Sequence, residues 1–328
     1  MKSKKILIFG GSGSLGKALI DRHLTQNIII NYSRDEWKHW QLDHKYKNKN
    51  LINILGDIRD LHKVREAVMR EKPHIIIIAS ALKHIERVEY SIRESIETNL
   101  IGVQNVLDSI ESNIHSLKNL EKVVFVSSDK ACSPVNVYGM CKALSEKLMI
   151  EKAYYIPDFD FVICRYGNVL NSKGSIIPLL HKIGRSKEYD HYNLTHPDMT
   201  RFVMTLDESC SLVEYAMHYG ESGDIIIPKL KSMYIRDLIS IFSDLYSKPV
   251  KTGKIRFGEK INESLINETQ SLYVQEVEKY YYIKAPHNAY AYNGQLKSFH
   301  YSSGESPINK SDLYTYLESK GMLTQTLG

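Results

Sequence analysis

Residues 4–16 read KKILIFGGSGSLG, and this stretch determines the fold that we predict. Its apolar run ends at Phe9 and is typical of a strand. Three glycines, Gly10, Gly13 and Gly16, follow at the spacing G-x-x-G-x-x-G before a helical pattern begins. Glycine allows a tight turn and lets backbone N–H groups approach a pyrophosphate, which the positive end of the next helix attracts. The stretch therefore predicts a dinucleotide-binding βαβ unit, with contacts from Gly10, Gly13, Ser14, Leu15 and Gly16.

Strand and helix patterns alternate from this loop to about residue 165. Continuous apolar strands between amphipathic helices indicate a parallel sheet that is covered on both faces. We therefore predict an α/β fold, a Rossmann-type doubly wound parallel sheet with a smaller C-terminal substrate-binding lobe. Residues 1–166 would form the nucleotide-binding domain, with a later return around 200–228, and 167–328 would form mainly the lobe. The expected strands are 4–9, 28–32, 53–55, 74–79, one around 123, 159–164 and 224–227; the expected helices are 15–24, 61–71, 91–111, one from about 137, 207–218 and 234–245.

Composition narrows the class of protein. Hydrophobic residues make up 43% and charged residues 25% of the 328 residues, which is ordinary for a soluble globular protein. The formal net charge is +5, but the basic run at 44–49 lies in a predicted polar connector, so we expect no nucleic-acid partner. The four cysteines lack metal-site spacing, which favours packing thiols, a reducing compartment and no metal. The first apolar run is too short for a signal peptide and no stretch could span a bilayer, so we expect a cytoplasmic protein without a membrane partner.

The residues after the second strand indicate which dinucleotide binds. Residues 33–36 read SRDE, and Ser33 and Arg34 would suit a 2′-phosphate, which favours NADP over NAD. The alternative is a surface Arg34 paired with one of the two acidic residues that follow it. Asp57 and Ile58 follow the third strand and would meet the adenine edge, although Asp57 could instead cap a turn. The remaining expected cofactor contacts are Ala79, Ala81, Lys83, Asn99, Tyr138 and Lys142.

Residues 127–142, SSDKACSPVNVYGMCK, carry the predicted chemistry. Tyr138 and Lys142 are four residues apart on a predicted helix and share a face, although Tyr-x-x-x-Lys also occurs by chance. A tyrosine titrates near pH 10, and Lys142 together with a nicotinamide ring would lower the pKa of Tyr138 so that it can act as a base. Ser128 would hydrogen-bond the same substrate oxygen. This set predicts oxidation of a substrate hydroxyl.

Asp129 and Lys130 are not needed for simple alcohol oxidation. Oxidation of a sugar at C4 makes its C5 hydrogen acidic. A neutral Lys130 could remove that proton, and a protonated Asp129 could deliver one to the departing C6 hydroxyl. Burial would favour both states, whereas an ion pair between the two groups would oppose them. A pair that only shapes the loop is the alternative.

With these residues the chain resembles the extended short-chain dehydrogenase/reductase superfamily, and more narrowly the soluble UDP-N-acetylglucosamine 4,6-dehydratases (5-inverting) of polysaccharide biosynthesis. The resemblance runs from about Lys4 to Pro286. It is carried by the ordered motifs GGSGSLG, YSRDE, GDIRD, ALKHIE, SSDKACSPVNVYGMCK, RYGNVLNSKGS, HPDMTRF, IPKLKSM and GEKINE. The triplet Ser-Asp-Lys is the discriminating feature, because related dTDP-glucose 4,6-dehydratases carry an acidic residue in place of the lysine and 4-epimerases lack the acid–base pair. Asn171, His196 and Asn262 depart from the family pattern.

The resemblance implies a complete reaction. C4 of a UDP-sugar is oxidised, water is lost across C5 and C6, hydride returns to C6, and C5 is reprotonated from the opposite face. It also implies self-association through the helices around 91–111 and 138–153. The substrate-lining residues would be Lys83, His84, Asn168, Ser172, Lys173, Arg201 and Glu259. Solvated tips are the alternative for Lys83 and His84, and a salt bridge to Asp198 or Asp207 is the alternative for Arg201. UDP-glucose 4,6-dehydratase activity and a catalytically silent NADP sensor are the competing functions.

Overall fold

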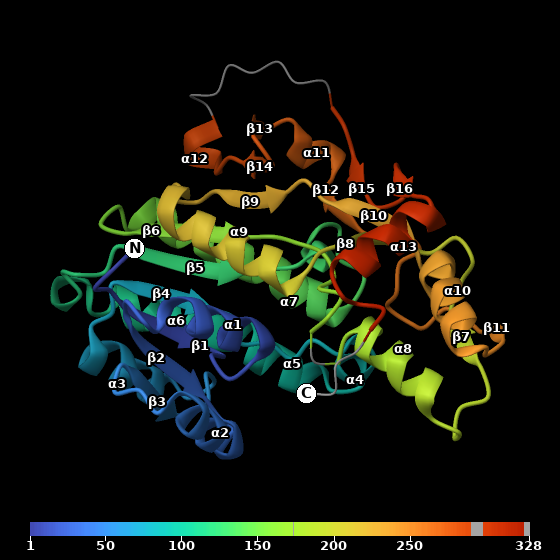
Figure 1. Cartoon of the computed structure of the whole chain (residues 1–328). Helices are drawn as coiled ribbons and strands as arrows, with labels where there is room; N and C mark the ends of the chain where they lie inside the picture. The colour runs from blue at the N-terminus through green and yellow to red at the C-terminus, as the bar shows by residue number, and fades with distance from the viewer. Residues whose placement is uncertain (173, 290–297, 325–328) are drawn as a thin grey trace.

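The computed structural model describes residues 1–172, 174–289 and 298–324. Within these residues a nine-stranded sheet has the order β13-β14-β9-β6-β5-β4-β1-β2-β3 (Figure 1). The seven strands from β9 to β3 are parallel, which confirms the predicted Rossmann-type fold. Their bounds are β1 Lys5–Phe9, β2 Ile28–Ser33, β3 Leu51–Leu55, β4 Ile75–Ile78, β5 Lys122–Val126, β6 Asp160–Cys164 and β9 Ile225–Pro228.

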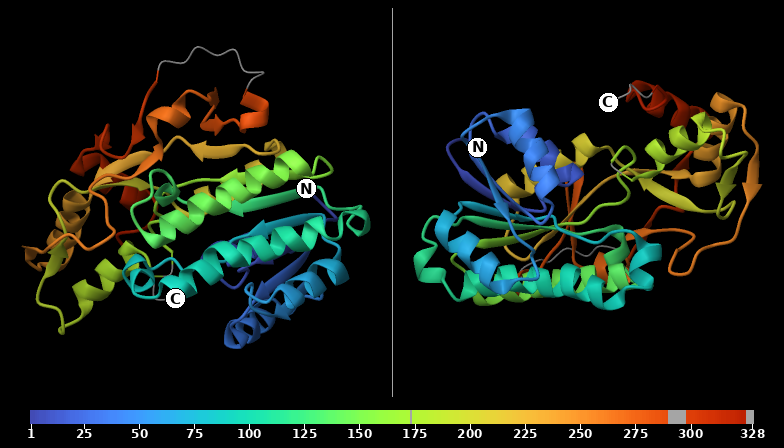
Figure 2. Two further views of the ribbon diagram at one scale, coloured as in Figure 1. Left: turned by 180° about the vertical axis from the view of Figure 1, so that it is seen from behind. Right: turned by 90° about the horizontal axis from the view of Figure 1, so that it is seen from below.

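Burial of apolar side chains on both faces explains why these segments form central strands. All four isoleucines of β4 are buried, as are all five residues of β5. Helices α3 (Leu61–Glu71), α6 (Gly102–Glu111) and α7 (Val137–Tyr155) pack on one face. Helices α1 (Ser14–His23), α2 (Glu36–Tyr46) and α9 (Leu206–Tyr219) pack on the other, so the sheet lies between two helical layers (Figure 2).

Three local predictions differ from the structure. The segment before the third strand, which was predicted to be a polar connector, contains helix α2. Its two tryptophans, Trp37 and Trp40, are exposed and stacked on each other. The segment therefore lacks the apolar stripe by which a helix is predicted. The third strand begins at Leu51 rather than at residue 53. The predicted helix over 91–111 is formed by α5 (Ile92–Ile96), the π-helical segment η1 (Glu97–Ile101) and α6.

The later part of the chain extends the main sheet and also forms a separate layer. The sequence did not predict strands β14 (Tyr280–Ile283) and β13 (Val274–Val277). Strand β14 pairs antiparallel with β9, and β13 pairs antiparallel with β14. A third apolar cluster joins α8 (Ile176–Arg185), α10 (Ile235–Tyr246) and α13 (Lys310–Ser319). The division of the chain at residue 166 remains a prediction. The other elements are β7 Tyr192–Leu194, β8 Thr200–Val203, β10 Lys231–Tyr234, β11 Val250–Thr252, β12 Ser264–Ile266, β15 Tyr301–Ser302, β16 Pro307–Ile308, α4 Ile85–Glu89, α11 Glu268–Ser271, α12 Pro286–Ala289 and two 3₁₀ turns, η2 Ile114–Ser116 and η3 Asp129–Ala131.

The four cysteines are buried and unbridged. Among the described residues, no helix has the length and apolar character needed to cross a bilayer.

Candidate active site

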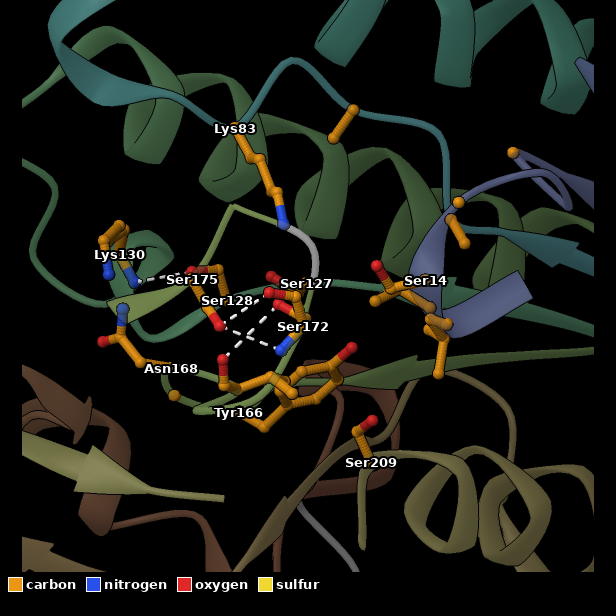
Figure 3. A pocket seen from close by; sticks show the side chains of 18 of the residues that line it. Ser14, Lys83, Ser127, Ser128, Lys130, Tyr166, Asn168, Ser172, Ser175 and Ser209 are labelled. Atoms are coloured by element: carbon orange, nitrogen blue, oxygen red, sulfur yellow. Dashed lines mark hydrogen bonds between the residues drawn. The ribbon is translucent and has the colours of Figure 1, made fainter. Parts of the chain in front are cut away.

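A cavity of about 360 Å³ lies at the carboxyl edge of the parallel sheet (Figure 3). Its walls come from the segments after β1, β4, β5 and β6, together with α7 and the start of α9. This is the edge at which open α/β sheets bind ligands. The structure therefore brings together the following predicted catalytic and substrate residues: Ser128, Asp129, Lys130, Tyr138, Lys142, Lys83, His84, Asn168 and Ser172.

The glycine loop forms one end of this cavity, where it is lined by Gly10, Gly13, Ser14, Leu15 and Gly16. Gly10 has φ +90°, and a Cβ atom there would lie 2.8 Å from the backbone nitrogen of Ser80. A Cβ at Gly16 would lie 2.4 Å from Cα of Gly11. Gly13 is the N-cap of α1 and brings no side chain between the helix end and a ligand. The loop therefore fits a pyrophosphate, because backbone N–H groups and the helix dipole favour an anion there.

A second cavity of about 330 Å³ adjoins the loop on the side of β2 and β3. The predicted residues Ser33, Arg34, Asp57, Ile58, Ala79 and Ala81 line it, together with Lys38 and Thr98, which were not predicted. Arg34 is half exposed and lies 3.5 Å from Asp57, whereas Asp35 caps α2 and pairs with Lys38. Arg34 is therefore paired with an acidic residue, as in the alternative, but the partner is Asp57 and not Asp35, one of the two residues that the alternative named. The two adjoining cavities fit the two halves of a dinucleotide.

Tyr138 and Lys142 lie on the first turns of α7, which Asn136 caps by accepting a hydrogen bond from the Gly139 backbone N–H. Lys142 Nζ donates to the backbone oxygen of Val126 at 2.7 Å, and burial lowers the pKa of Lys142 to about 7. Burial raises the pKa of Tyr138, while the charge of Lys130 and a hydrogen bond with Ser128 act to lower it. The pKa of Tyr138 is thus raised rather than lowered, and the nearby charge that acts to lower it is that of Lys130. Lowering by Lys142 together with a nicotinamide ring stays a prediction.

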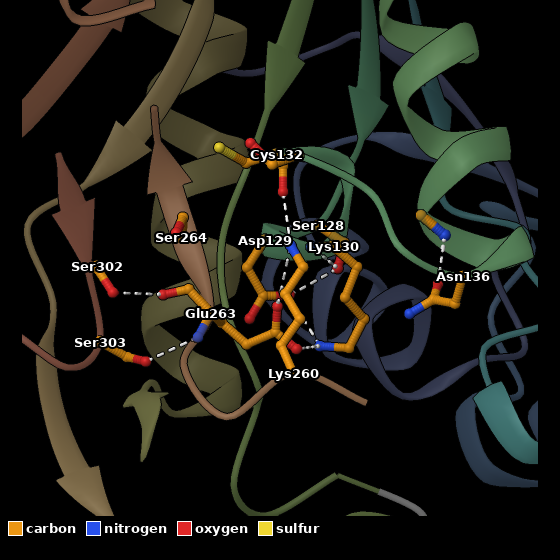
Figure 4. Close-up of polar contacts among 12 residues, drawn as sticks. Ser128, Asp129, Lys130, Cys132, Asn136, Lys260, Glu263, Ser264, Ser302 and Ser303 are labelled. Atoms are coloured by element: carbon orange, nitrogen blue, oxygen red, sulfur yellow. Dashed lines mark hydrogen bonds and ion pairs between the residues drawn. The ribbon is translucent and has the colours of Figure 1, made fainter. Parts of the chain in front are cut away.

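Asp129 and Lys130 form a buried ion pair in the 3₁₀ turn η3 (Figure 4). Lys130 Nζ lies 2.9 Å from Asp129 Oδ1 and 3.4 Å from Glu263 Oε1. Burial acts to lower the pKa of Lys130, but the two carboxylates outweigh it and raise that pKa above its ordinary value. Of the two opposing effects that the sequence left open, the attraction of the carboxylates therefore outweighs burial and favours the charged form of Lys130. The second carboxylate, Glu263, is what the prediction missed.

Three predicted residues are not among the described residues that line either cavity. Asn99 is buried in η1, and its side chain accepts from the Leu82 N–H and donates to the Leu82 oxygen, so it holds the segment after β4. Glu259 lies 3.5 Å from Arg256. Arg201 Nη1 donates to the backbone oxygens of Thr200, Lys260 and Ile261.

Arg201 was predicted to bind the substrate, with a salt bridge to Asp198 or Asp207 as the alternative. Asp198 pairs instead with Arg236, and Asp207 pairs with Arg22. The charge of Arg201 acts on Lys130 and Glu263. Lys173 lies outside the described residues.

Several cavity residues escaped prediction because their own side chains carry no charge. Ser127, Tyr166, Gly167, Ser175 and Ser209 line the wall. The motif RYGN contained a signal for two of them, since its tyrosine and glycine follow β6 at the carboxyl edge. The close packing at Gly167 was also not predicted: a Cβ atom there would lie 2.7 Å from Phe202 Cβ.

A buried charge pair supports this wall from behind. Arg165 Nε and Nη2 donate to Glu146 Oε1 and Oε2 at 2.9 and 2.5 Å. Arg165 Nη1 also donates to the Leu265 oxygen and to Gln270 Oε1, both at 2.9 Å. Ser127 donates to Glu146 at 2.5 Å. The pair therefore ties β5, β6 and α7 to the segment that contains β12 and α11.

The sequence and the structure of this chain are similar to those of several known proteins. Residues 6–285 match the family model described as polysaccharide biosynthesis protein. The UDP-glucose 4-epimerase of Rickettsia canadensis is 37% identical over 290 residues, which are 85% of this chain and 82% of that protein. The X-ray structure of Pen from Bacillus thuringiensis has a TM-score of 0.88 at 29% identity, and covers 97% of this chain and 99% of its own. DesIV (dTDP-glucose 4,6-dehydratase) from Streptomyces venezuelae, with NAD and TYD bound, shares the fold at a TM-score of 0.66 and 19% identity, over 78% of this chain and 86% of its own.

Proposed function

The chain belongs to the polysaccharide biosynthesis protein family, and from this premise we propose that it is a UDP-N-acetylglucosamine 4,6-dehydratase that inverts C5. The observation that carries the proposal is the position of Asp129, Lys130 and Tyr138 in the wall of one cavity beside the glycine loop. A phenol, an amine and a carboxyl group are the set required for C4 oxidation followed by loss of water across C5 and C6. The product is a UDP-4-keto-6-deoxy-hexosamine.

The side chains have separate tasks in this reaction. A bound nicotinamide dinucleotide supplies the hydride acceptor and donor. Tyr138 takes the proton of the C4 hydroxyl, and Ser128 donates a hydrogen bond to the same oxygen. Lys130 then removes the C5 proton, and Asp129 gives a proton to the departing C6 hydroxyl. Reprotonation at C5 from the opposite face inverts that centre.

The ion pair is one proton transfer away from the state that this chemistry needs. Elimination requires Lys130 without its extra proton and Asp129 with one. Moving a proton along the 2.9 Å contact from Lys130 Nζ to Asp129 Oδ1 produces both groups in the required form. The pair therefore needs no proton exchange with solvent before it can act.

We also propose NADP as the dinucleotide. Ser33, Arg34 and Lys38 line the second cavity, and the two cations would attract a 2′-phosphate. DesIV was crystallised with NAD, but its likeness to this chain is one of fold. NAD is the alternative cofactor.

A UDP-glucose 4-epimerase is the second candidate, because the relative from Rickettsia canadensis has that name. An epimerase oxidises and reduces C4, and it has no chemical use for an acid and a base directed at C5 and C6. The buried Asp129–Lys130 pair in the cavity wall therefore favours the dehydratase. UDP-glucose 4,6-dehydratase and a silent NADP-binding sensor are the remaining alternatives.

Incubation of the purified protein with UDP-N-acetylglucosamine or UDP-glucose in deuterated water separates these functions. The dehydratase proposal expects loss of one water by mass spectrometry, and proton NMR then reports a C6 methyl group and the C5 configuration. A sugar inverted at C4 without loss of water identifies an epimerase. Dehydration of UDP-glucose alone contradicts the substrate assignment, and bound cofactor without any turnover supports the sensor.

We propose that the protein self-associates through α5 and α7. The exposed fractions of Ile92, Met140 and Leu144 are 51%, 48% and 53%, although these side chains are apolar. A second copy that covers them would remove this apolar surface from water.

A further inference from the structure

Glu263 contacts the predicted base but was not assigned a role from the sequence. It precedes β12, and its backbone N–H donates to Ser303 Oγ at 2.9 Å while its oxygen accepts from the Ser303 N–H at 2.8 Å (Figure 4). Its side chain is buried, and Oε1 lies 3.4 Å from Lys130 Nζ. Oε2 is a buried atom without a hydrogen-bond partner among the described residues. The backbone contacts therefore direct a buried carboxylate at Lys130.

Two carboxylates share one ammonium group, although the elimination uses only one of them as an acid. Before the C5 proton moves, Lys130 has passed its proton to Asp129. Once Lys130 has taken the C5 proton, it is an ammonium beside a protonated, neutral Asp129. In that interval Glu263 is the carboxylate that faces the new charge at 3.4 Å. A buried ammonium without a counter-ion is strongly disfavoured.

On the basis of the proposed dehydratase function, we propose that Glu263 is a positioning residue that orients Lys130 and acts as the counter-ion of its ammonium during elimination. The C5–H bond breaks and its proton moves to Lys130 Nζ, while the electron pair moves into the C4 carbonyl. The electron pair then returns to form a C5–C6 double bond as the C6–O bond breaks, and the oxygen leaves as water with the proton from Asp129. Glu263 keeps its charge throughout, and no further reactant is needed.

Burial raises the pKa of Glu263, and three nearby cations act against that rise. Arg201 on β8 and Lys260 on the preceding segment both act on its carboxyl group, as does Lys130. Lys260 Nζ lies 3.9 Å from Glu263 Oε2 and donates to the Cys132 oxygen at 2.8 Å. Burial and the charge of Asp129 act in the opposite direction and raise the pKa of Glu263. Transfer of the Lys130 proton to Asp129 removes that second carboxylate charge.

The test compares the two half-reactions in Glu263→Gln, Glu263→Asp and wild-type protein. Absorbance of the reduced dinucleotide reports C4 oxidation, and deuterium incorporation from solvent reports C5–H cleavage. In Glu263→Gln we expect C4 oxidation within about twofold of wild type and C5 exchange slower by about 10–100-fold, so that reduced dinucleotide accumulates. Glu263→Asp, which keeps the charge, should recover most of the exchange. Glu276→Gln, which removes an exposed carboxylate paired with Lys229, is the matched control and should behave as wild type.

The outcomes separate this role from the proposed function. C5 exchange in Glu263→Gln within about twofold of wild type would overturn the role of Glu263, and so would an equal loss of both half-reactions, which indicates a structural role. If Glu263→Gln does not fold, Glu263→Asp decides. C5 exchange slowed by about two- to tenfold with intact C4 oxidation supports the role, because the carboxylate is kept but lies farther from Lys130. Unchanged C5 exchange, or equal loss of both half-reactions, overturns it. Wild-type protein that oxidises C4 without losing water would instead overturn the dehydratase function, and with it the role of Glu263.

Discussion

Replacing Arg165 by methionine tests how strongly the buried charge pair stabilises the site. The substitution removes two hydrogen bonds to Glu146 and one each to Leu265 and Gln270, and the exposed fraction of Arg165 is only 1%. Glu146 then remains buried, with Ser127 as its described hydrogen-bond donor. Breaking a buried ion pair by removing one partner costs about 3–5 kcal/mol.

This cost converts into a measurable change in the melting temperature. An unfolding entropy of about 2.1 cal/mol/K per residue over 328 residues is about 0.7 kcal/mol/K, so a loss of about 4 kcal/mol lowers Tm by about 6 °C. The double variant Glu146→Gln/Arg165→Met removes the stranded charge and should recover at least about 2 kcal/mol, or about 3 °C.

Calorimetry and urea unfolding of the single and double variants provide the measurement. Lys229→Met is the control, because it breaks an exposed ion pair with Glu276 and should cost less than about 1 kcal/mol. A loss below about 1 kcal/mol in Arg165→Met, or additive losses in the double variant, would refute the reasoning that a buried charge is left without its partner.

Four further predictions test the site and the fold. Tyr138→Phe should abolish C4 oxidation, measured by dinucleotide absorbance, and leave NADP binding intact by calorimetry; residual oxidation near the wild-type rate contradicts the base role. Arg34→Ala should weaken NADP binding by about tenfold, because a charge-assisted hydrogen bond contributes about 1.5–3 kcal/mol and Arg34 is half exposed, while NAD binding changes little; equal losses contradict the 2′-phosphate assignment. Burial raises the pKa of Asp224 to about 6, so its contribution to stability is fully present below the unfolded pKa near 4 and is lost as pH rises through 6. The free energy of unfolding, measured with urea, should therefore fall by at most about 3 kcal/mol between about pH 4 and 7 because of Asp224. In Asp224→Asn this fall should be smaller, and an unchanged pH dependence contradicts the assignment to Asp224. Leu144→Asp should reduce the mass found by analytical ultracentrifugation if α7 lies in an interface, and an unchanged mass argues against that interface.

Local patterns predicted the features that depend on neighbouring residues. The glycine loop, the isoleucines of β4 and the Tyr138–Lys142 spacing are each encoded within a few positions, and the structure places them at one edge of the sheet. Helix α2 was not predicted, because the periodic spacing of apolar residues indicates a helix only when those residues form a buried face. Its tryptophans, Trp37 and Trp40, are exposed.

Contacts between distant segments could not be predicted in the same way. Glu263 approaches Lys130, and Gln270 approaches Arg165, only because β12 and α11 fold back against η3 and β6. The protonation state of Lys130 depended on Glu263, so the sequence left it open. The motif GEKINE contains two glutamates, either of which could have been predicted to lie in the site. The first of them, Glu259, was predicted to line the substrate site, whereas the second, Glu263, contacts Lys130.

The insertion of β9 between β6 and β14 has a consequence for biosynthesis. On the ribosome, residues 1–164 emerge well before 225–283 are made, so the growing chain carries β6 with an open edge next to apolar Val162 and Ile163. Unpaired strand edges of this kind promote aggregation of nascent and truncated chains. We therefore expect fragments that stop before Ile225 to collect in inclusion bodies despite containing the glycine loop, and fragments that include β9, β14 and β13 to be more soluble.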